Sequence, residues 1–356
     1  MRLGIIGLPS CGKTTIFNAL TGGSLPTGVR GDRFQVHTAV SDVPDRRVDD
    51  LSALFKPRKT IYAKVTYADI GGLKAEAGKE GLPGSLLNQL SQMDGFVHVV
   101  RAFESEMVPH PAGRVDPVRD LAAMEAELLL NDMLTVERRL EKLREERQKG
   151  VGREKAVIER ELALFERLSD VLGQDQPLRE AAFPPEDERA MAVFGFLTRK
   201  PMLVVVNLAE GQAPPALAAT GQGVQVLALQ GEIEMEIAQL PPEEARAFLT
   251  EYGIAEAGCD RVLRASYDLL GVQSFFTVGE DEVRAWTVAR GATALAAAAA
   301  IHTDLERGFI RAEVINWKEL LNLGGLAPAR AVGKLRVEGR EYLVQDGEVV
   351  HIRFNA

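Results

Sequence analysis

The sequence predicts a protein of the α/β class, with a helical hairpin inserted into its first domain and a small β-rich domain at its C-terminal end. Three observations support this prediction. Strand-like apolar runs alternate with helical patterns through residues 1–110, as in a parallel sheet covered by helices. A segment rich in Glu, Arg, Leu and Ala occupies residues 118–172. Short strand-like runs separated by turn residues follow from about residue 275.

The first element is a strand followed by a glycine-containing loop and a helix. Residues 3–6 form an apolar run, and apolar residues within 16–20 have the spacing of a buried helix face. Between them, residues 7–14 read GLPSCGKT, a full match to G-x-x-x-x-G-K-[ST]. The backbone N–H groups of such a loop and the helix N-terminus form an anion-binding nest. The motif therefore predicts a P-loop that binds a nucleoside triphosphate.

The side chains of this loop have distinct expected roles. Lys13 is expected to reach the β- and γ-phosphates and act in catalysis, and the Thr14 hydroxyl to bind Mg²⁺. The residues predicted to bind the nucleotide here are Gly7, Pro9, Ser10, Cys11, Gly12, Lys13, Thr14 and Thr15. A thiol near a helix N-terminus and a lysine can have a lowered pKa, so Cys11 is either a reactive thiol whose oxidation blocks nucleotide binding or a small residue that fits the loop.

A second part of the site follows the strand-like run at 61–68. Asp69, at the strand end, is placed to hold the water shell of Mg²⁺, and Gly72 can offer its backbone N–H to a γ-phosphate. In Ras-like sites a glutamine just after this glycine orients the attacking water. Here that position is Leu73, which cannot hydrogen-bond water. Either turnover is slow or another polar group substitutes.

Residues 118–172 show helical apolar spacing in two runs, on either side of RQKGVGREK. Two helices with charged outer faces, joined by a glycine-containing turn, predict an antiparallel coiled-coil hairpin. Its outer face is either a solvated surface or a partner-binding arm. Because the α/β pattern returns afterwards, we predict a P-loop nucleotide-binding domain at 1–117 and 173–274, the hairpin at 118–172, and a C-terminal domain at 275–356.

The base-binding part of the site is predicted where the apolar run at 201–207 ends. The sequence Asn207-Leu208-Ala209-Glu210 falls where a guanine-reading N-K-x-D motif would lie. Glu210 replaces the aspartate that accepts hydrogen bonds from guanine, and Leu208 replaces the lysine that flanks the ring. We predict that Asn207, Leu208 and Glu210 contact the base. The altered motif is compatible with adenine as the bound base but does not prove that adenine is bound.

Composition limits the class of protein. The net charge of −9 argues against a globally basic nucleic-acid binder, although a local basic face remains possible. No apolar run is long enough for a membrane-spanning helix, and the first strand begins too early to leave room for a signal peptide. Two cysteines do not make a disulfide framework. We therefore expect a cytoplasmic protein with no membrane association.

These motifs, in this order, resemble the YchF/Obg-like ATPase family, a branch of the translation-factor-related P-loop proteins. The resemblance spans nearly the whole chain and is carried by GLPSCGKTTIFNALTG, DIGGLKAEAGKEGLPG, FVHVVRAFE, RVDP and VVNLAE. Two C-terminal stretches, EVRAWTVARGATALAAAAAIHTDLERGFIRAEVI and AVGKLRVEGREYLVQDGEVVHIRFN, resemble the family's TGS domain. That domain is a β-grasp module often tied to RNA or ribosome contacts.

The resemblance implies roles that the residues alone do not. Family members prefer ATP and share the N-x-x-E form seen at Asn207 and Glu210. They also carry a hydrophobic residue where this chain has Leu73, and a loop histidine that is proposed to serve instead of glutamine matches His110. The resemblance further implies Mg²⁺ as cofactor, ATP or GTP as substrate, and ribosome or RNA contact through the TGS domain and the hairpin.

This chain departs from the family pattern in three places. Ser10 and Cys11 replace the usual Asn-Val, and that asparagine is linked to potassium binding in related proteins. The stretch after Thr38 is shorter than the usual switch I, and Thr38 is the candidate Mg²⁺ ligand there. VQVLALQGEIE lacks the usual small polar turn that contacts the base. The sequence therefore resembles a divergent member of the family.

Three hypotheses about the function are compatible with these residues. The leading hypothesis is a slowly hydrolysing ATPase that acts as a switch on the ribosome or a translation-related partner. The second is a GTPase of the Obg-related class. The third is a nucleotide-gated binding module with negligible hydrolysis.

Overall fold

A computed structural model describes residues 1–27, 36–71, 82–149, 153–217, 223–251, 254 and 256–355. It divides into two compact units, Met1–Ala39 with Thr66–Val262, and Val40–Val65 with Leu263–Ala356. The predicted mixed α/β class is confirmed. The expected domain division assigned residues 40–65 to the nucleotide-binding domain, whereas the structure groups them with the C-terminal residues. The reason is a non-local strand pairing described below.

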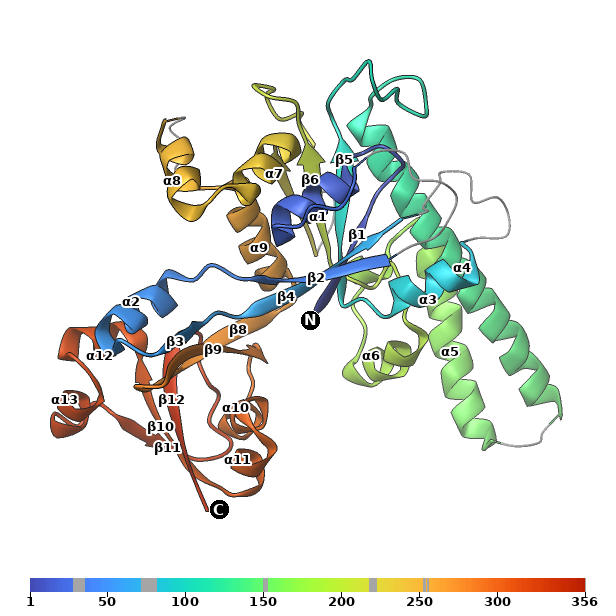
Figure 1. Ribbon diagram of the computed structural model, residues 1–356. Helices are drawn as coiled ribbons and strands as arrows, with labels where there is room; N and C mark the ends of the chain where they lie inside the picture. Colours follow the sequence, from blue (N-terminus) through green and yellow to red (C-terminus); the bar gives the residue numbers. More distant parts are fainter. Residues whose placement is uncertain are drawn as a thin grey trace. The chain divides into compact units, whose positions relative to one another are not determined.

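The first sheet is six-stranded, with the order β2-β4-β1-β5-β6-β7 (Figure 1). The registered pairs β1–β4, β1–β5, β5–β6 and β6–β7 are all parallel. The central strands are short, apolar and almost fully buried, as expected for a sheet covered on both faces. The strands are β1 (Arg2–Ile6), β2 (Val36–Asp42), β4 (Lys64–Ile70), β5 (Gly95–Arg101), β6 (Met202–Asn207) and β7 (Val224–Leu229).

Helices on this sheet bury their apolar stripes against it. α1 (Lys13–Thr21) and α7 (Gly231–Gln239) pack against each other. α3 (Gly84–Ser91) and the first half of α4 (Pro117–Lys149) contribute Leu86, Leu90, Met124 and Leu128 to a core shared with β5 and β6. The remaining helical elements of this unit are α5 (Lys155–Leu172), η1 (Leu178–Glu180), α6 (Pro185–Met191), η2 (Ala192–Phe194) and α8 (Pro242–Glu251), and α9 (Gly258–Leu269) crosses the boundary between the units.

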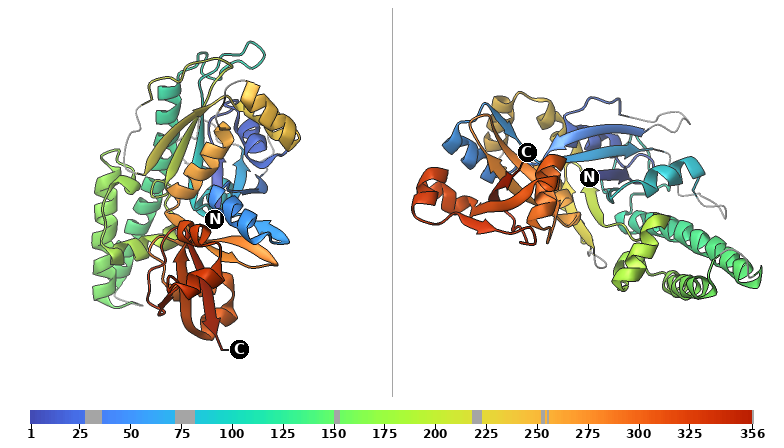
Figure 2. Two further views of the ribbon diagram at one scale, coloured as in Figure 1. Left: turned by 90° about the vertical axis from the view of Figure 1, so that its left-hand side faces the viewer. Right: turned by 90° about the horizontal axis from the view of Figure 1, so that it is seen from below.

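The helices α4 and α5 lie side by side, as both views of the chain show (Figures 1 and 2). Their facing side chains form a separate apolar cluster that includes Val136, Leu140, Leu143, Ile158, Leu162 and Phe165. Ion pairs also join the two helices, such as Arg139 of α4 with Glu161 of α5 at 2.6 Å. In the chain, the pair lies between β5 and β6, which are neighbours in the sheet.

The second unit contains a six-stranded mixed sheet with the order β11-β10-β12-β8-β9-β3. β3 pairs in parallel with β9 through Lys59↔Glu282, which ties the segment after β2 to the C-terminal part of the chain. The strands are β3 (Lys59–Ile61), β8 (Val272–Val278), β9 (Glu282–Ala289), β10 (Phe309–Asn316), β11 (Arg336–Glu338) and β12 (Glu348–Phe354).

Helices complete the second unit. The alanine-rich α10 (Ala294–Ile301) begins at Thr293, whose side chain accepts a hydrogen bond from the Ala296 N–H. Its small buried side chains join a core with Phe275, Phe309 and Val314. The other helices are α2 (Arg46–Phe55), α11 (Thr303–Arg307), α12 (Trp317–Leu323) and α13 (Leu326–Ala331). None of the helices in the described part of the chain combines the length and apolarity that crossing a bilayer requires.

Candidate functional site

The first sheet positions the candidate site at the carboxyl ends of its central strands. β1 has β4 on one side and β5 on the other, so the strand order reverses there. In open α/β sheets, ligands bind in the crevice outside the carboxyl ends of strands at such a reversal. The P-loop leaves β1 at this point and runs directly into α1. Asp69 lies at the same end of β4, and Asn207 ends β6.

Both glycines of the motif are required by geometry. Gly12 caps α1 with φ +93°, and a Cβ there would lie 2.2 Å from Asn207 Nδ2. A Cβ on Gly7 would lie 2.4 Å from the carbonyl oxygen of Val99. Any side chain at either position would force the loop out of its path. The sequence pattern thus reflects close backbone approach as well as positive φ.

Lys13, Thr14 and Asp69 lie together in this site. The Lys13 ammonium donates to the carbonyls of Gly7 (2.8 Å) and Leu8 (2.9 Å) and so lies over its own loop. Thr14 Oγ1 donates to Asp69 Oδ2 at 2.9 Å. This brings a hydroxyl and a carboxylate, both hard oxygen ligands, to one point beside the P-loop.

Asn207 braces the P-loop against the start of α7. Its Nδ2 donates to the Cys11 carbonyl at 3.1 Å, and its Oδ1 accepts from the Gly231 N–H at 3.0 Å. Leu208 is buried, while Glu210 is exposed in the turn that follows. Gln212 holds that turn: its side chain accepts from Ala209 N at 2.9 Å and donates to the Ala102 carbonyl at 2.8 Å.

Of the two interpretations of Cys11, the structure favours the small residue that fits the loop. Cys11 is 3% exposed, and burial raises the pKa of its thiol above the ordinary value despite the lowering influence of the Lys13 charge. A buried thiol that stays protonated is a poor nucleophile and a poor target for oxidants. Cys11 therefore serves as a small buried residue within the loop.

The other predicted residues are only partly brought together. Pro9, Ser10 and Thr15 are half-buried along the loop and the first turn of α1. Thr38 is exposed on β2, and within the described residues it makes no hydrogen bond to Thr14 or Asp69. Gly72 and Leu73 lie outside the described residues.

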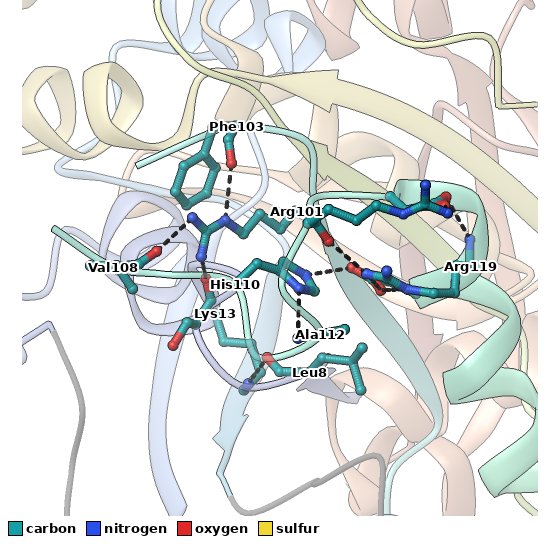
Figure 3. Close-up of polar contacts among 12 residues, drawn as sticks. Leu8, Lys13, Arg101, Phe103, Val108, His110, Ala112 and Arg119 are labelled. Carbon is teal, nitrogen blue, oxygen red and sulfur yellow. Dashed lines mark hydrogen bonds and ion pairs between the residues drawn. The ribbon is translucent and has the colours of Figure 1, made fainter. Parts of the chain in front are cut away.

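His110 is held by a buried network, shown in Figure 3. The backbone N–H of Ala112 donates to His110 Nδ1 at 3.1 Å, so in the neutral ring the proton lies on Nε2. His110 Nε2 is 2.8 Å from Asp120 Oδ2, and Arg119 donates to the other oxygen of that carboxylate at 2.7 Å. Both His110 and Asp120 are less than a tenth exposed. In this arrangement both ring nitrogens of His110 already have a hydrogen-bond partner within the protein.

Arg101 is the residue of this site that sequence reasoning missed. It ends β5 and is 1% exposed, although it carries a permanent charge. Its guanidinium donates to the carbonyls of Phe103 (3.0 Å), Val108 (2.7 Å) and Ser10 (3.3 Å) (Figure 3). It also lies 4.4 Å from the centroid of the Phe103 ring. The available signal was a single arginine that ends an apolar strand, FVHVVR, at the nucleotide-binding edge.

Comparisons with known proteins agree with this geometry. The family model of a 50S ribosome-binding GTPase matches residues 2–139, and the YchF-GTPase C-terminal model, described as a protein of unknown function (DUF933), matches residues 272–355.

Relatives match over almost their whole length. "Ribosome-binding ATPase YchF" of Bacillus subtilis is 40% identical, covering 100% of this chain and 99% of the relative. "Obg-like ATPase 1" of Caenorhabditis elegans is 33% identical, covering 100% and 92%. The solved structure of the Schizosaccharomyces pombe YchF GTPase superposes with a TM-score of 0.85 at 29% identity, covering 99% of this chain and 97% of that one. The resemblance noted in the sequence is confirmed: the chain belongs to the YchF family of P-loop NTPases.

Proposed function

We propose that this chain is a slow ATPase that binds ATP in preference to GTP and acts as a switch on the ribosome. The observation that carries the proposal is the cluster at the carboxyl end of β1, where the P-loop, Lys13 and the Thr14–Asp69 pair lie together. Relatives that match the full chain are named ribosome-binding ATPases, which supports the choice of partner.

Mg²⁺ fits the oxygen ligands of the proposed site. Within the part of the chain that the structure describes, no three His, Cys, Asp or Glu side chains converge on a metal position. Mg²⁺ is usually held by one or two carboxylates, waters and substrate phosphates, so Thr14 and Asp69 are a suitable protein contribution. We propose Thr38 as a third ligand. When bound, the ion would neutralise charge on the phosphate oxygens.

The nucleotide preference follows from the segment after β6. Guanine recognition needs an acidic acceptor held close to the ring and a lysine beside it, and here Glu210 is exposed and Leu208 is buried and apolar. Asn207 is committed to bracing Cys11 and Gly231. We therefore propose that Leu208 offers an apolar surface to adenine, with Asn207 and Glu210 at its edge.

Catalysis would rest on Lys13, on the backbone N–H of Gly72 and on His110. The Lys13 ammonium supplies positive charge beside the phosphates, and positioning of the nucleotide lowers the barrier. We propose that His110 orients the attacking water in place of the glutamine that Leu73 replaces. To do so it must exchange its hydrogen bond with Asp120 for one with water, which is consistent with a low rate of turnover.

We propose that contact with the ribosome involves α4, α5 and the C-terminal unit. Residues 118–172 would form the protruding hairpin, and residues 275–356 a TGS-like β-grasp domain. The nucleotide-binding domain would comprise the parts of 1–117 and 173–274 that lie in the first unit. Residues 40–65 and 263–274 belong to the second unit, where β3 pairs with β9.

A turnover assay with and without purified ribosomes tests this function. We expect slow Mg²⁺-dependent release of phosphate from ATP and a change of rate when ribosomes are added. Faster turnover of GTP than of ATP would favour the Obg-related GTPase instead. Tight ATP binding with no phosphate release, with or without ribosomes, would favour a nucleotide-gated binding module.

A further inference from the structure

Arg101 joins two segments that the proposed reaction needs. Its Nε and one terminal nitrogen donate to Phe103 and Val108, in the loop that leads to His110. Its other terminal nitrogen donates to Ser10 in the P-loop. A guanidinium is planar and rigid, so these hydrogen bonds fix the two backbone segments relative to each other.

The contact with Ser10 acts on a strained part of the loop. Ser10 has φ +61°, a left-handed conformation that is uncommon for a residue with a side chain. Such conformations persist where surrounding contacts enforce them. The peptide plane between Ser10 and Cys11 is rigid, with its C=O and N–H on opposite sides. Holding the Ser10 carbonyl toward Arg101 therefore directs the Cys11 N–H away from Arg101 and sets the orientation of one donor of the loop.

The charge of Arg101 is also unusual for a buried group. In the described part of the chain its polar contacts are all with neutral backbone carbonyls, and it also lies over the Phe103 ring. A buried cation without a carboxylate partner is costly unless hydrogen bonds satisfy it. The three carbonyls around Arg101 supply these hydrogen bonds, so the guanidinium and the two backbone segments hold one another in place.

We propose that Arg101 is a positioning residue for triphosphate hydrolysis, which keeps the P-loop and the His110 loop in one fixed relation. This inference rests on the proposed ATPase function. It implies that losing Arg101 lowers kcat more than it weakens nucleotide binding, because the reacting groups are misplaced while the phosphate contacts of Lys13 remain.

The test compares Arg101→Ala and Arg101→Lys with Arg179→Ala. Arg179 is a matched control: its side chain is 5% exposed, and it contacts Glu125 and Thr198 rather than the P-loop. We expect kcat for ATP to fall about tenfold to a hundredfold in both Arg101 variants, since a small misplacement can cost this much. The dissociation constant of a non-hydrolysable ATP analogue should change much less.

Rescue experiments separate the guanidinium from a simple positive charge. Lysine at position 101 should not restore kcat, because one ammonium cannot reproduce the planar fork of a guanidinium. Millimolar guanidinium should raise kcat of Arg101→Ala and not of Arg179→Ala.

Two results would overturn the proposal. One is a kcat in Arg101→Lys equal to that of the parent. The other is a loss in Arg101→Ala that Arg179→Ala matches, because that loss would be structural.

Amide hydrogen exchange gives a readout that needs no turnover. Arg101→Ala should speed exchange in residues 8–12 and in 103–110 together, and Arg179→Ala in neither. If the parent protein releases no phosphate, the ATPase proposal fails. Hydrogen exchange then tests by itself whether Arg101 holds the two segments together. Faster exchange in both segments supports the positioning role, and faster exchange in only one contradicts it.

Discussion

Charged side chains have different hydrogen-bond partners at the nucleotide-binding edge, where β1, β4 and β6 end, and in the second unit. At the edge, Lys13 and Arg101 end on neutral backbone carbonyls. In the second unit, the buried carboxylate of Glu313 accepts hydrogen bonds from both Arg330 and Arg353. Burial tends to raise the pKa of Glu313, but the two arginines outweigh it and lower that pKa. In this cluster the negative charge is therefore neutralised by side chains of the same unit.

A second carboxylate in that unit repeats the pattern. Glu348 is 2% exposed and accepts hydrogen bonds from Arg336 and from the Tyr342 hydroxyl at 2.7 Å. Cations matched by carboxylates hold a fold together, whereas cations that end on carbonyls can still accept an anion. This contrast supports the proposal that the edge beside Lys13 receives phosphates.

Removing the P-loop cation should have the largest effect. We expect Lys13→Ala to lower ATP hydrolysis by about a thousandfold, because a preorganised charge beside the transferred phosphate is lost. Lys200→Ala is the matched control, since Lys200 also donates to backbone carbonyls, those of Ser91 and Met93. Circular dichroism checks that both variants fold. Unchanged hydrolysis in a folded Lys13→Ala protein would refute the assignment of the P-loop.

Removing the loop histidine should have the next largest effect. We expect His110→Ala to lower kcat at saturating ATP by about a hundredfold, the lower range for a positioned proton-transfer group, while ATP affinity changes little. His302→Ala is the control, because His302 is exposed and caps α11. Equal turnover of the His110 variant and the parent would mean that His110 serves only to hold its loop against Asp120.

Protein stability should depend on pH through a buried histidine of β5, His98. Burial, with smaller contributions from the charges of Lys13 and Arg179, lowers the pKa of His98 to about 3. Because the unfolded chain binds this proton near pH 6.5 and the folded chain does not, stability is present above that pH and falls as pH drops from 6.5 toward 3.

We expect the free energy of unfolding to lose about 2 kcal/mol between pH 7 and pH 5 through His98. Urea denaturation of His98→Leu should show that much less pH dependence over this range, while His302→Leu should behave as the parent does. A pH dependence in His98→Leu equal to that of the parent would contradict a neutral, buried His98.

The smallest effect is expected where charge is already matched. Glu313→Gln should lower the free energy of unfolding by about 1 kcal/mol, because Arg330 and Arg353 are half-exposed and water replaces part of the lost interaction. Nucleotide affinity should not change. An altered affinity for ATP would mean that these ion pairs also affect nucleotide binding, which would contradict a purely structural role for them.

Much of the fold and of the P-loop followed from local sequence. The residues from Gly7 to Thr14 are contiguous and have a fixed spacing, so the motif alone located the phosphate-binding loop. Asp69 was found from its place at a strand end, and Asn207 from its match to the place of an N-K-x-D motif; the parallel strands bring both to one edge.

The remaining features depend on contacts between distant residues, which periodicity does not encode. β3 could not be assigned to the second unit because its partner β9 is far away in the chain. Likewise, Arg101 looked like an ordinary charged residue after an apolar strand until its contact with Ser10 was known. Both interpretations of Cys11 stayed open in the sequence because nearby charge is visible there and burial is not; the burial of Cys11 favours the unreactive one.

A competition titration distinguishes an ATP site from a GTP site at this edge. ATP and GTP would each displace a fluorescent ATP analogue from the purified protein in the presence of Mg²⁺, with Lys13→Ala as the blank. We predict that ATP displaces the analogue at a concentration at least about tenfold lower than GTP, a difference of about 1.4 kcal/mol in binding. If GTP is the tighter competitor by that factor, or if the Lys13→Ala blank binds the analogue as well as the parent does, the account of this edge as an ATP site is contradicted.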